Sequence, residues 1–195
     1  ETQIECTGLF TKYADQGYAP ACWIYTQTDG QLTHSFDNVT EAIKDSCNIF
    51  FYTVADNLGI RKLMEYAKNF GLGESTGIEL SETTGNMANP DNHLNYDVDS
   101  WVDGDTVQAG IGQSDSMFTP LQLAEYCAAI ANGGTRHSAA ILKSVRSYDY
   151  SRQLYQKETE VLSTVESADY NWAAVQRGMY LMANDITSSS STVYY

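Results

Sequence analysis

The sequence predicts an α+β fold that is rich in helices, with short strands and long loops. Apolar residues recur at helical spacing over residues 38–71, and the same spacing returns over 119–131 and 167–184. Residues 72–118 are instead dense in Gly, Asn and Asp, which interrupt regular structure. With 195 residues, of which 43% are hydrophobic, the chain is long enough to form one domain or most of one.

Residues 1–35 lack helical periodicity and are predicted to form a strand and loop segment. Residues 4–10 and 21–25 contain β-branched and aromatic side chains, which favour short strands. Asp29 and Gly30 follow the second of these strands, and this pair is typical of a turn.

Residues 36–71 are predicted to form three consecutive helices. Asn38 and Glu41 have the spacing of a capping box, in which each side chain accepts from a backbone N–H at the helix start. Gly59 and Gly71 are predicted to end the second and third helices. The apolar faces of the first two helices are predicted to consist of Val39, Ala42, Ile43 and Cys47, and of Phe50, Phe51, Val54, Ala55 and Leu58.

The rest of the chain is predicted to comprise a loop-rich stretch over 72–118, a helix, hairpin and helix over 119–187, and a mobile tail over 188–195. Thr119 and Gln122 form a second capping box, with a proline between them at the first helical position. Cys127 lies within that helical pattern and is predicted to belong to the core. Residues 141–146 alternate as in a strand, and residues 154–155 with residues 160–162 are predicted to form a companion hairpin.

The chain carries 25 acidic and 11 basic residues, which gives a formal net charge of −14. Nucleic-acid phosphates are bound by Lys and Arg, so this charge argues against nucleic acid as a partner. It also argues against a polybasic patch that would bind a membrane surface. The sequence contains no run of about 18 apolar residues of the kind that spans a membrane.

The tripeptide Ser46-Cys47-Asn48 is the strongest candidate for a catalytic site. It lies between two helical patterns, where side chains can project into a cleft from a rigid backbone. The hydroxyl of Ser46 can both donate and accept a proton, and the carboxamide of Asn48 carries a donor and an acceptor on one plane. The alternative is structural: Ser and Asn are favoured helix caps, and both residues could cap the helix that begins near Ile49.

Ser-x-Asn is one of three motifs found together in active-site serine penicillin-binding proteins and β-lactamases. The other motifs that accompany it here, in order, are Gly71-Leu72-Gly73, Thr76-Gly77-Ile78-Glu79-Leu80, Gly104-Asp105-Thr106, Gly110-Ile111-Gly112-Gln113, Thr119-Pro120-Leu121-Gln122 and Ala131-Asn132-Gly133-Gly134. From about residue 30 to about residue 185 the chain thus resembles the transpeptidase domain of class B penicillin-binding proteins, most closely the elongation-type branch. The resemblance implies the helix-rich portion of the penicillin-binding protein transpeptidase and serine β-lactamase-like fold.

The other two catalytic motifs do not occur in this sequence. No serine has a lysine three residues on, and Lys143-Ser144-Val145 lacks the glycine of a Lys-Ser-Gly motif. By the resemblance, we expect residues 1–195 to be a single partial transpeptidase domain. Ser46 would relay a proton and Asn48 would bind the catalytic lysine and a substrate amide, while the chain alone would be inactive because it lacks the nucleophile.

The resemblance also implies partners and a location for the parent protein. That parent would cross-link peptidoglycan stem peptides through a serine acyl-enzyme, bind β-lactams, and work with other proteins of the elongation machinery. It would lie on the extracytoplasmic face of the cell membrane, held by an N-terminal anchor. The alternatives are a non-catalytic module that binds a wall precursor or a partner, and a β-lactam sensor domain.

The cysteines do not form a metal-binding pattern by spacing. Cys47 is the middle residue of the tripeptide and is expected to point away from substrate. Cys6 and Cys22 leave three alternatives open: free thiols, a disulfide, or a zinc site together with His34. Some elongation-type relatives carry zinc near this region, but the spacing here does not establish a site. We therefore assign neither a metal ligand nor a cofactor.

The histidines His34, His93 and His137 have no serine or acid at a spacing that indicates a hydrolase triad. Each is expected to be a surface residue or a hydrogen-bonded polar residue. The resemblance places Trp101, Asp103, Asp105 and Gln113 in a segment that runs near the active-site cleft. Within it, Gly110 and Gly112 are expected to form a tight turn that packs against the core.

Overall fold

The computed structural model describes residues 2–93 and 100–189, and the chain divides into two compact units. The first unit comprises Glu1–Leu63, Ala88–Asp115 and Ala168–Tyr195, and the second comprises Met64–Met87 and Ser116–Ser167. Each unit is assembled from segments that are distant in the sequence. In the described part of the chain, no helix is both long enough and apolar enough to cross a membrane.

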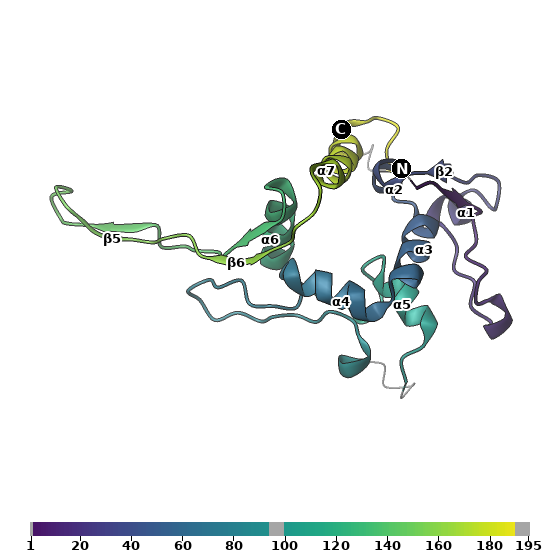
Figure 1. The fold of residues 1–195 in the computed structure, drawn as a ribbon, viewed down its shortest axis with the longest axis horizontal. Helices are drawn as coiled ribbons and strands as arrows, with labels where there is room; N and C mark the ends of the chain where they lie inside the picture. The colour runs from purple at the N-terminus through teal and green to yellow at the C-terminus, as the bar shows by residue number, and fades with distance from the viewer. Residues whose placement is uncertain (1, 94–99, 190–195) are drawn as a thin grey trace. The chain divides into compact units, whose positions relative to one another are not determined.

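The first unit is mainly helical and contains one small sheet (Figure 1). Its elements are β1 (Ile4–Cys6), η1 (Ala14–Gln16), α1 (Trp23–Gln27), β2 (Ser35–Asp37), α2 (Val39–Asp45), α3 (Asn48–Leu58), the first turn of α4 (Ile60–Asn69), η2 (Pro90–Asn92), α5 (Asp103–Ala109) and α7 (Asp169–Asn184). Strands β1 and β2 pair in antiparallel fashion, with Ile4 opposite Asp37 and Cys6 opposite Ser35. This pairing brings the start of the chain beside the segment that leads into α2.

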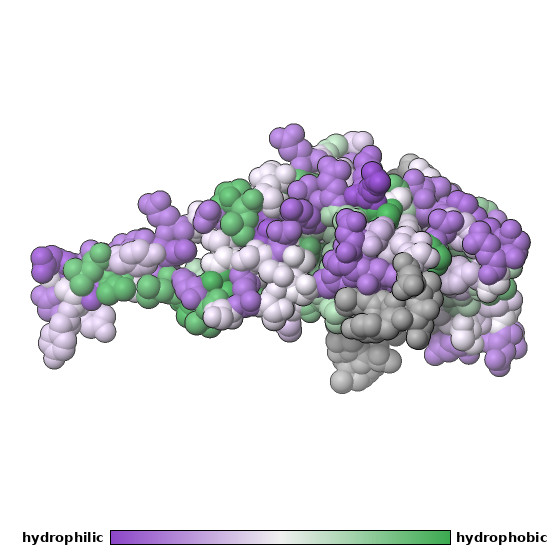
Figure 2. Space-filling model, turned by 90° about the horizontal axis from the view of Figure 1, so that it is seen from below, coloured by the Kyte–Doolittle hydropathy of each residue, from purple (hydrophilic) through white to green (hydrophobic). Residues whose placement is uncertain are grey.

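The second unit contains one long helix and two separate antiparallel strand pairs. Its elements are the rest of α4, α6 (Pro120–Ala131), β3 (Thr135–His137), β4 (Ser144–Arg146), β5 (Gln153–Gln156) and β6 (Val161–Thr164). Strand β3 pairs with β6, and β4 pairs with β5 to form a projecting hairpin. Figure 2 shows hydrophobic residues interspersed with hydrophilic ones on the surface of this hairpin.

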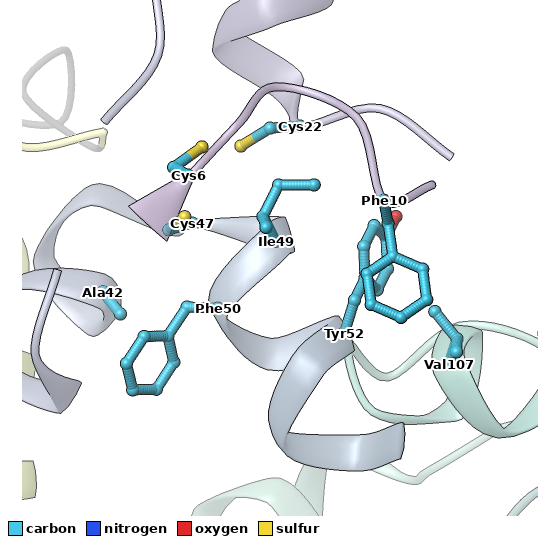
Figure 3. Packing of buried hydrophobic residues seen from close by; sticks show 9 residues of the cluster. All are labelled: Cys6, Phe10, Cys22, Ala42, Cys47, Ile49, Phe50, Tyr52 and Val107. Atoms are coloured by element: carbon cyan, nitrogen blue, oxygen red, sulfur yellow. The ribbon is translucent and has the colours of Figure 1, made fainter. Parts of the chain in front are cut away.

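The core of the first unit is apolar and sulfur-rich, and it is built around α3 (Figure 3). Its buried members are Cys6, Phe10, Cys22, Ala42, Cys47, Ile49, Phe50, Tyr52 and Val107. Helix α5 lies close against α3, since a side chain on Gly110 would collide with Ala55. This agrees with the expected tight turn at Gly110, whose missing side chain permits the close approach.

Helix α7 packs against α2 within the first unit. The hydroxyl of Thr40 donates to the carbonyl of Ala174 at 3.0 Å. A Cβ on Gly178 would lie 2.8 Å from the Cβ of Ile43, so only glycine permits this spacing. The predicted helix over 167–184 is therefore confirmed, and it covers the helix that leads to the Ser-x-Asn tripeptide.

The interior of the second unit is polar. Gln122 is fully buried, and its side-chain amide donates to the carbonyls of Glu74 and Thr84 at 2.7 Å each. Buried Arg136 donates through Nε to Glu125 at 2.7 Å and through its terminal nitrogen to the carbonyl of Ser75. These contacts join the loop before residue 85, helix α6 and strand β3.

Both predicted capping boxes are confirmed. Asn38 accepts from the N–H of Glu41 at 3.1 Å, and the Glu41 side chain accepts from the N–H of Asn38 at 3.1 Å. Thr119 and Gln122 make the same reciprocal pair at the start of α6. The turn at Asp29 and its following glycine is also present, with positive φ at both residues.

Two predictions of secondary structure are wrong. Residues 21–25 do not form a strand, because the chain turns into helix α1 after Cys22, and the indole of Trp23 donates to the carbonyl of Asp45 at 3.0 Å. Residues 154–155 do not form a hairpin with residues 160–162, because β5 pairs with β4 and β6 pairs with β3. The loop-rich stretch 72–118 contains one short helix, α5.

Two predictions of burial are also wrong. Cys127 is exposed on α6, because that helix turns its polar residues Gln122 and Glu125 inward to make the network described above. Val54 is 38% exposed, whereas Tyr52, which was not on the predicted face, is buried. In the predicted tail, Ser188 and Ser189 donate to the carbonyls of residues 182 and 44. Residues 190–195 lie outside the described part.

Candidate active site and thiol cluster

The Ser-x-Asn tripeptide forms the junction between α2 and α3. Ser46 ends α2 in the left-handed conformation, with φ of 54°, and Cys47 then adopts an extended conformation. Asn48 is the first residue of α3. A left-handed backbone is uncommon for a residue other than glycine, and it reverses the chain sharply between the two helices.

The two candidate catalytic side chains differ in their surroundings. Both Ser46 and Asn48 are half-buried, and within the described residues the Ser46 hydroxyl has no hydrogen-bond partner. The Asn48 amide donates to the carbonyl of Ala21 at 3.4 Å. Neither side chain caps α3, whose N-cap residue is Cys47 and lacks a side-chain cap. The capping alternative therefore does not explain this pair.

Directly beside the tripeptide, four potential metal ligands lie together. Cys6 comes from β1, Cys22 precedes α1, His34 precedes β2, and Cys47 is the middle residue of Ser-x-Asn. Their ligand atoms all lie within 4.8 Å of one another, and Cys22 Sγ is 3.5 Å from His34 Nδ1. Figure 3 shows the three cysteine side chains gathered beside the start of α3. The three cysteines are buried and His34 is half-buried.

The groups of this cluster have shifted pKa values. A hydrogen bond from the Cys47 thiol lowers the pKa of Cys22 far below that of an ordinary thiol, and His34 and the backbone N–H of Asn48 act in the same direction. Burial raises the pKa of Cys6, and the bond to the Cys22 sulfur raises the pKa of Cys47. Of the three thiols, Cys22 is the one whose pKa is lowered.

The pKa values of His34 and of the nearby Asp37 are shifted as well. Burial by itself would lower the pKa of His34, but the Cys22 sulfur raises it above the ordinary value. Burial raises the pKa of Asp37, which is 2% exposed and whose Oδ2 has no partner among the described residues. Asp37 thus lies close enough to Cys47 and His34 to interact with both.

This donor set fits a structural zinc ion. Zinc is commonly held by three cysteines and one histidine in a tetrahedron, with Zn–S distances of about 2.3 Å, which corresponds to sulfurs about 3.8 Å apart. Four atoms within 4.8 Å of one another reach that geometry by small side-chain movements. A bound cation would also allow all three thiols to ionise, because metal ligands must be deprotonated.

The structure changes the sequence-based interpretation of the cysteines. None of the four cysteines forms a disulfide in the structure, so the disulfide alternative is not seen. The zinc alternative included Cys6, Cys22 and His34, but it missed Cys47. Spacing gave no signal for this ligand, because 25 residues separate Cys22 from Cys47. Only the pairing of β1 with β2 brings the first ligand to the others.

The segment around α5 contains a pair formed by a histidine and an acid that sequence analysis did not identify. His93 Nδ1 lies 2.6 Å from Asp115 Oδ2, and the His93 side chain is 9% exposed. The indole of Trp101 donates to the hydroxyl of Thr106 at 2.9 Å. His137, by contrast, is exposed on β3.

The fold and the Ser-x-Asn junction together define a class of protein. The model of the penicillin-binding protein transpeptidase domain matches residues 9–193. The chain therefore belongs to the penicillin-binding protein transpeptidase family, and the resemblance to its elongation-type class B branch is confirmed.

Relatives within this family carry a more specific name. Peptidoglycan D,D-transpeptidase MrdA of Haemophilus influenzae is 33% identical over 155 residues, which are 77% of this chain and 23% of that protein. MrdA of Escherichia coli is 32% identical over 152 residues, which are 77% of this chain and 24% of that protein. The chain thus spans about a quarter of the length of these curated relatives.

Solved structures show the same fold. Penicillin-binding protein 2 of Pseudomonas aeruginosa matches with a TM-score of 0.78 at 22% identity, over 98% of this chain and 40% of that chain. The protein of the same name from Helicobacter pylori matches with a TM-score of 0.76 at 23% identity, over 98% and 33%. The predicted α+β transpeptidase fold is therefore confirmed.

Proposed function

We propose that this chain forms one wall of the active site of a peptidoglycan D,D-transpeptidase. The observation that carries the proposal is the junction of α2 and α3. There the Ser46 hydroxyl, which has no hydrogen-bond partner among the described residues, and the Asn48 carboxamide lie two residues apart on a rigid backbone. The relatives named as peptidoglycan D,D-transpeptidases share this region of the family. The substrate would be the stem peptides that such an enzyme cross-links.

In this proposal, Ser46 and Asn48 assist a nucleophile that this sequence does not supply. The Ser46 hydroxyl can pass a proton towards the leaving amine, since it both donates and accepts. The Asn48 carboxamide can hold a lysine ammonium with its oxygen while its nitrogen contacts a substrate carbonyl. Because no serine here is followed by a lysine three residues on, acylation requires a group outside these 195 residues.

Acylation by benzylpenicillin, followed by intact mass, tests this assignment. We expect no adduct on the 195-residue chain and one adduct on a protein extended at both ends through the two missing motifs. In the extended protein, Ser46→Ala should slow acylation by at least about 100-fold, the usual range for loss of a proton-transfer group. Asn48→Ala should also slow it, because the catalytic lysine loses its partner. Ser35→Ala is the matched control, because Ser35 is an exposed serine that also has a left-handed backbone.

Two results would reject the assignment. An adduct on the 195-residue chain would mean that the nucleophile lies within it. Equal acylation rates in the Ser46→Ala, Ser35→Ala and unsubstituted extended proteins would mean that the Ser46 hydroxyl takes no part.

We also propose that Cys6, Cys22, His34 and Cys47 hold a structural zinc ion that fixes the Ser-x-Asn junction. Four protein ligands fill a tetrahedral site and leave no position for water or substrate, which is typical of structural rather than catalytic zinc. The metal would join β1, the start of α1 and the residue between Ser46 and Asn48. It would thereby position the two catalytic side chains without contacting the substrate.

Metal content provides the test, and it does not depend on activity. The purified chain should contain about one zinc per molecule, and Cys47→Ser should reduce this content by at least about tenfold. Cys127→Ser is the matched control, since Cys127 is exposed and outside the cluster. Chelation should lower the melting temperature of the original chain and of the control alike, but not that of Cys47→Ser. Equal zinc content in both variants would reject the site.

The partners and location of the parent protein follow from the same proposal. A solved complex pairs penicillin-binding protein 2 of Helicobacter pylori with MreC, and the former matches this chain with a TM-score of 0.75 at 23% identity. We propose a comparable partner from the elongation machinery, β-lactams as inhibitors, and an anchored position on the extracytoplasmic face of the cell membrane. A single, partial transpeptidase domain over 1–195 remains part of the proposal.

A further inference from the structure

The β4–β5 hairpin of the second unit differs in charge from the rest of the chain. Residues 141–157 contain four cations, Lys143, Arg146, Arg152 and Lys157, and a single acid, although the whole chain has a net charge of −14. None of these four cations forms a salt bridge with another described residue. The strand register places Lys143 opposite Lys157, which costs stability within a hairpin. Residues 141–157 therefore carry a net positive charge, although Glu79 lies close enough to Lys157 for the two charges to interact.

The tip of the hairpin presents two tyrosines to solvent. Tyr148 is completely exposed and Tyr150 is 76% exposed. Tyr150 has a φ of 59°, a left-handed conformation that is uncommon for a bulky residue. Such backbone strain persists only when surrounding contacts enforce it. Both rings are accessible to a ligand.

A hydrogen-bond network keeps this tip rigid. The hydroxyls of Ser147 and Ser151 donate to Asp149 at 2.6 and 2.8 Å, and the N–H of Arg152 donates to Ser147 Oγ at 3.0 Å. The N–H of Tyr150 donates to the carbonyl of Ser147 at 2.9 Å. The one acid of the hairpin is therefore engaged within its own turn, and the tyrosines are presented by a preorganised loop.

Part of this tip and the strand before it line an open, shallow concavity, formed by Ser144, Val145, Arg146, Ser147, Tyr148 and Tyr150. Tyrosine offers a flat apolar ring with a polar hydroxyl, and the guanidinium of arginine matches the geometry of a carboxylate. The lining thus suits a ligand that combines flat apolar faces, hydroxyl groups and carboxylates.

We propose that this concavity binds an anionic glycan strand that bears carboxylates, such as uncross-linked peptidoglycan with its stem peptides. The sugar rings would pack on Tyr148 and Tyr150, and a carboxylate would pair with Arg146. The choice of peptidoglycan as the polymer rests on the proposed function. The expectation of a glycan that bears carboxylates rests on the charges and rings of the hairpin alone. The hairpin would be a second binding site for the polymer, formed by residues other than Ser46 and Asn48.

A membrane surface fits this hairpin less well. A hairpin that inserts into a lipid interface carries its apolar residues at the tip, but residues 147–152 contain no aliphatic side chain. The exposed aliphatic residues Ile141, Leu142 and Leu154 are all outside the tip. Lipid binding is therefore an outcome of the test that would overturn the proposal.

Co-sedimentation of the 195-residue chain with insoluble, purified peptidoglycan tests the proposal. We expect binding that weakens as salt increases. Two double variants should each lose about tenfold in affinity: one combines Arg146→Ala with Arg152→Ala, and the other combines Tyr148→Ala with Tyr150→Ala. The matched controls are Arg61→Ala with Lys62→Ala, which removes two exposed cations of α4, and Tyr170→Ala, which removes an exposed tyrosine of α7. These controls should bind as the unsubstituted chain does.

Further arms separate the ligand classes. Insoluble chitin, a neutral glycan, should bind at least about tenfold more weakly than peptidoglycan, since it lacks carboxylates. The proposal fails if the controls lose as much affinity as the hairpin variants, if the hairpin variants bind normally, or if anionic phospholipid vesicles bind and peptidoglycan does not. Sedimentation requires no nucleophile, so this failure would leave the acylation result of the extended protein unaffected.

Discussion

The two units of this chain are stabilised by opposite kinds of interior. The first unit buries apolar and sulfur-containing side chains around α3, and its stability derives mainly from their removal from water. The second unit buries Gln122 and the ion pair of Glu125 with Arg136, in addition to a few apolar residues. An apolar interior loses stability according to the volume that a substitution removes, whereas removing one member of a buried polar network leaves its partner without a hydrogen bond. The two units should therefore respond differently to equally conservative substitutions.

The tryptophans allow the two units to be followed separately. All three, Trp23, Trp101 and Trp172, belong to the first unit. Tryptophan fluorescence consequently reports the unfolding of the first unit, whereas far-ultraviolet circular dichroism reports both. Comparing the two signals in urea shows which unit a substitution destabilises.

The largest effect is expected from Arg136→Ala in the second unit. It leaves the buried Glu125 carboxylate without its cation, which typically costs about 3–5 kcal/mol. The circular dichroism transition should shift to lower urea, and the shift should exceed that of the fluorescence transition. Replacing both partners by leucine should cost much less, because no uncompensated charge remains. A double variant as unstable as Arg136→Ala would show that the network is not the cause.

In the first unit, Ile49→Ala should destabilise through a cavity. Ile49 is 3% exposed next to the Ser-x-Asn junction, and such truncations cost about 2–5 kcal/mol, whereas Ile49→Val should cost only about 0.5–1.5 kcal/mol. In Ile49→Ala, the fluorescence transition should shift to lower urea by more than the circular dichroism transition does. Val54→Ala on the same helix is the control and should change the free energy of unfolding by under about 0.5 kcal/mol, since Val54 is 38% exposed. A loss of stability that grows with the volume removed would distinguish this apolar interior from the polar network of the second unit.

Gly178→Ala tests the close packing of α7 on α2. In an exposed helix this change stabilises, since alanine has the higher helix propensity. Here the new methyl group would meet Ile43 and the carbonyl of Thr40, and overpacking of this kind costs about 1–3 kcal/mol. The change in the free energy of unfolding is measured from tryptophan fluorescence in urea. A loss of stability is expected, and a gain would mean that the two helices are not in close contact.

The smallest effects should be the same in both units. Asn38→Ala and Thr119→Ala each remove one half of a capping box, and each should cost about 1 kcal/mol. Asn38→Asp is the control for the first unit, because aspartate caps about as well as asparagine. Thermal unfolding of the three variants should give two equal losses and one small change. A large difference between the two losses would show that capping depends on the surrounding interior.

Much of the local structure is determined by the sequence. The capping boxes at Asn38 and Thr119, the helices that follow them and the final helix all agree with the sequence pattern, because caps and helical periodicity depend on residues within a few turns of one another. The Ser46 and Asn48 tripeptide was likewise identified from adjacent residues. The family followed from a series of short motifs in fixed order.

Only the tertiary structure decided what required distant residues to meet. It turned residues 23–27 into a helix anchored by Trp23 on Asp45, paired β3 with β6, and turned the polar side of α6 inward so that Cys127 is exposed. It also brought Cys6, Cys22, His34 and Cys47 together. Sequence spacing contains no record of such contacts, because they depend on strand pairing and on which polar groups find partners inside the fold.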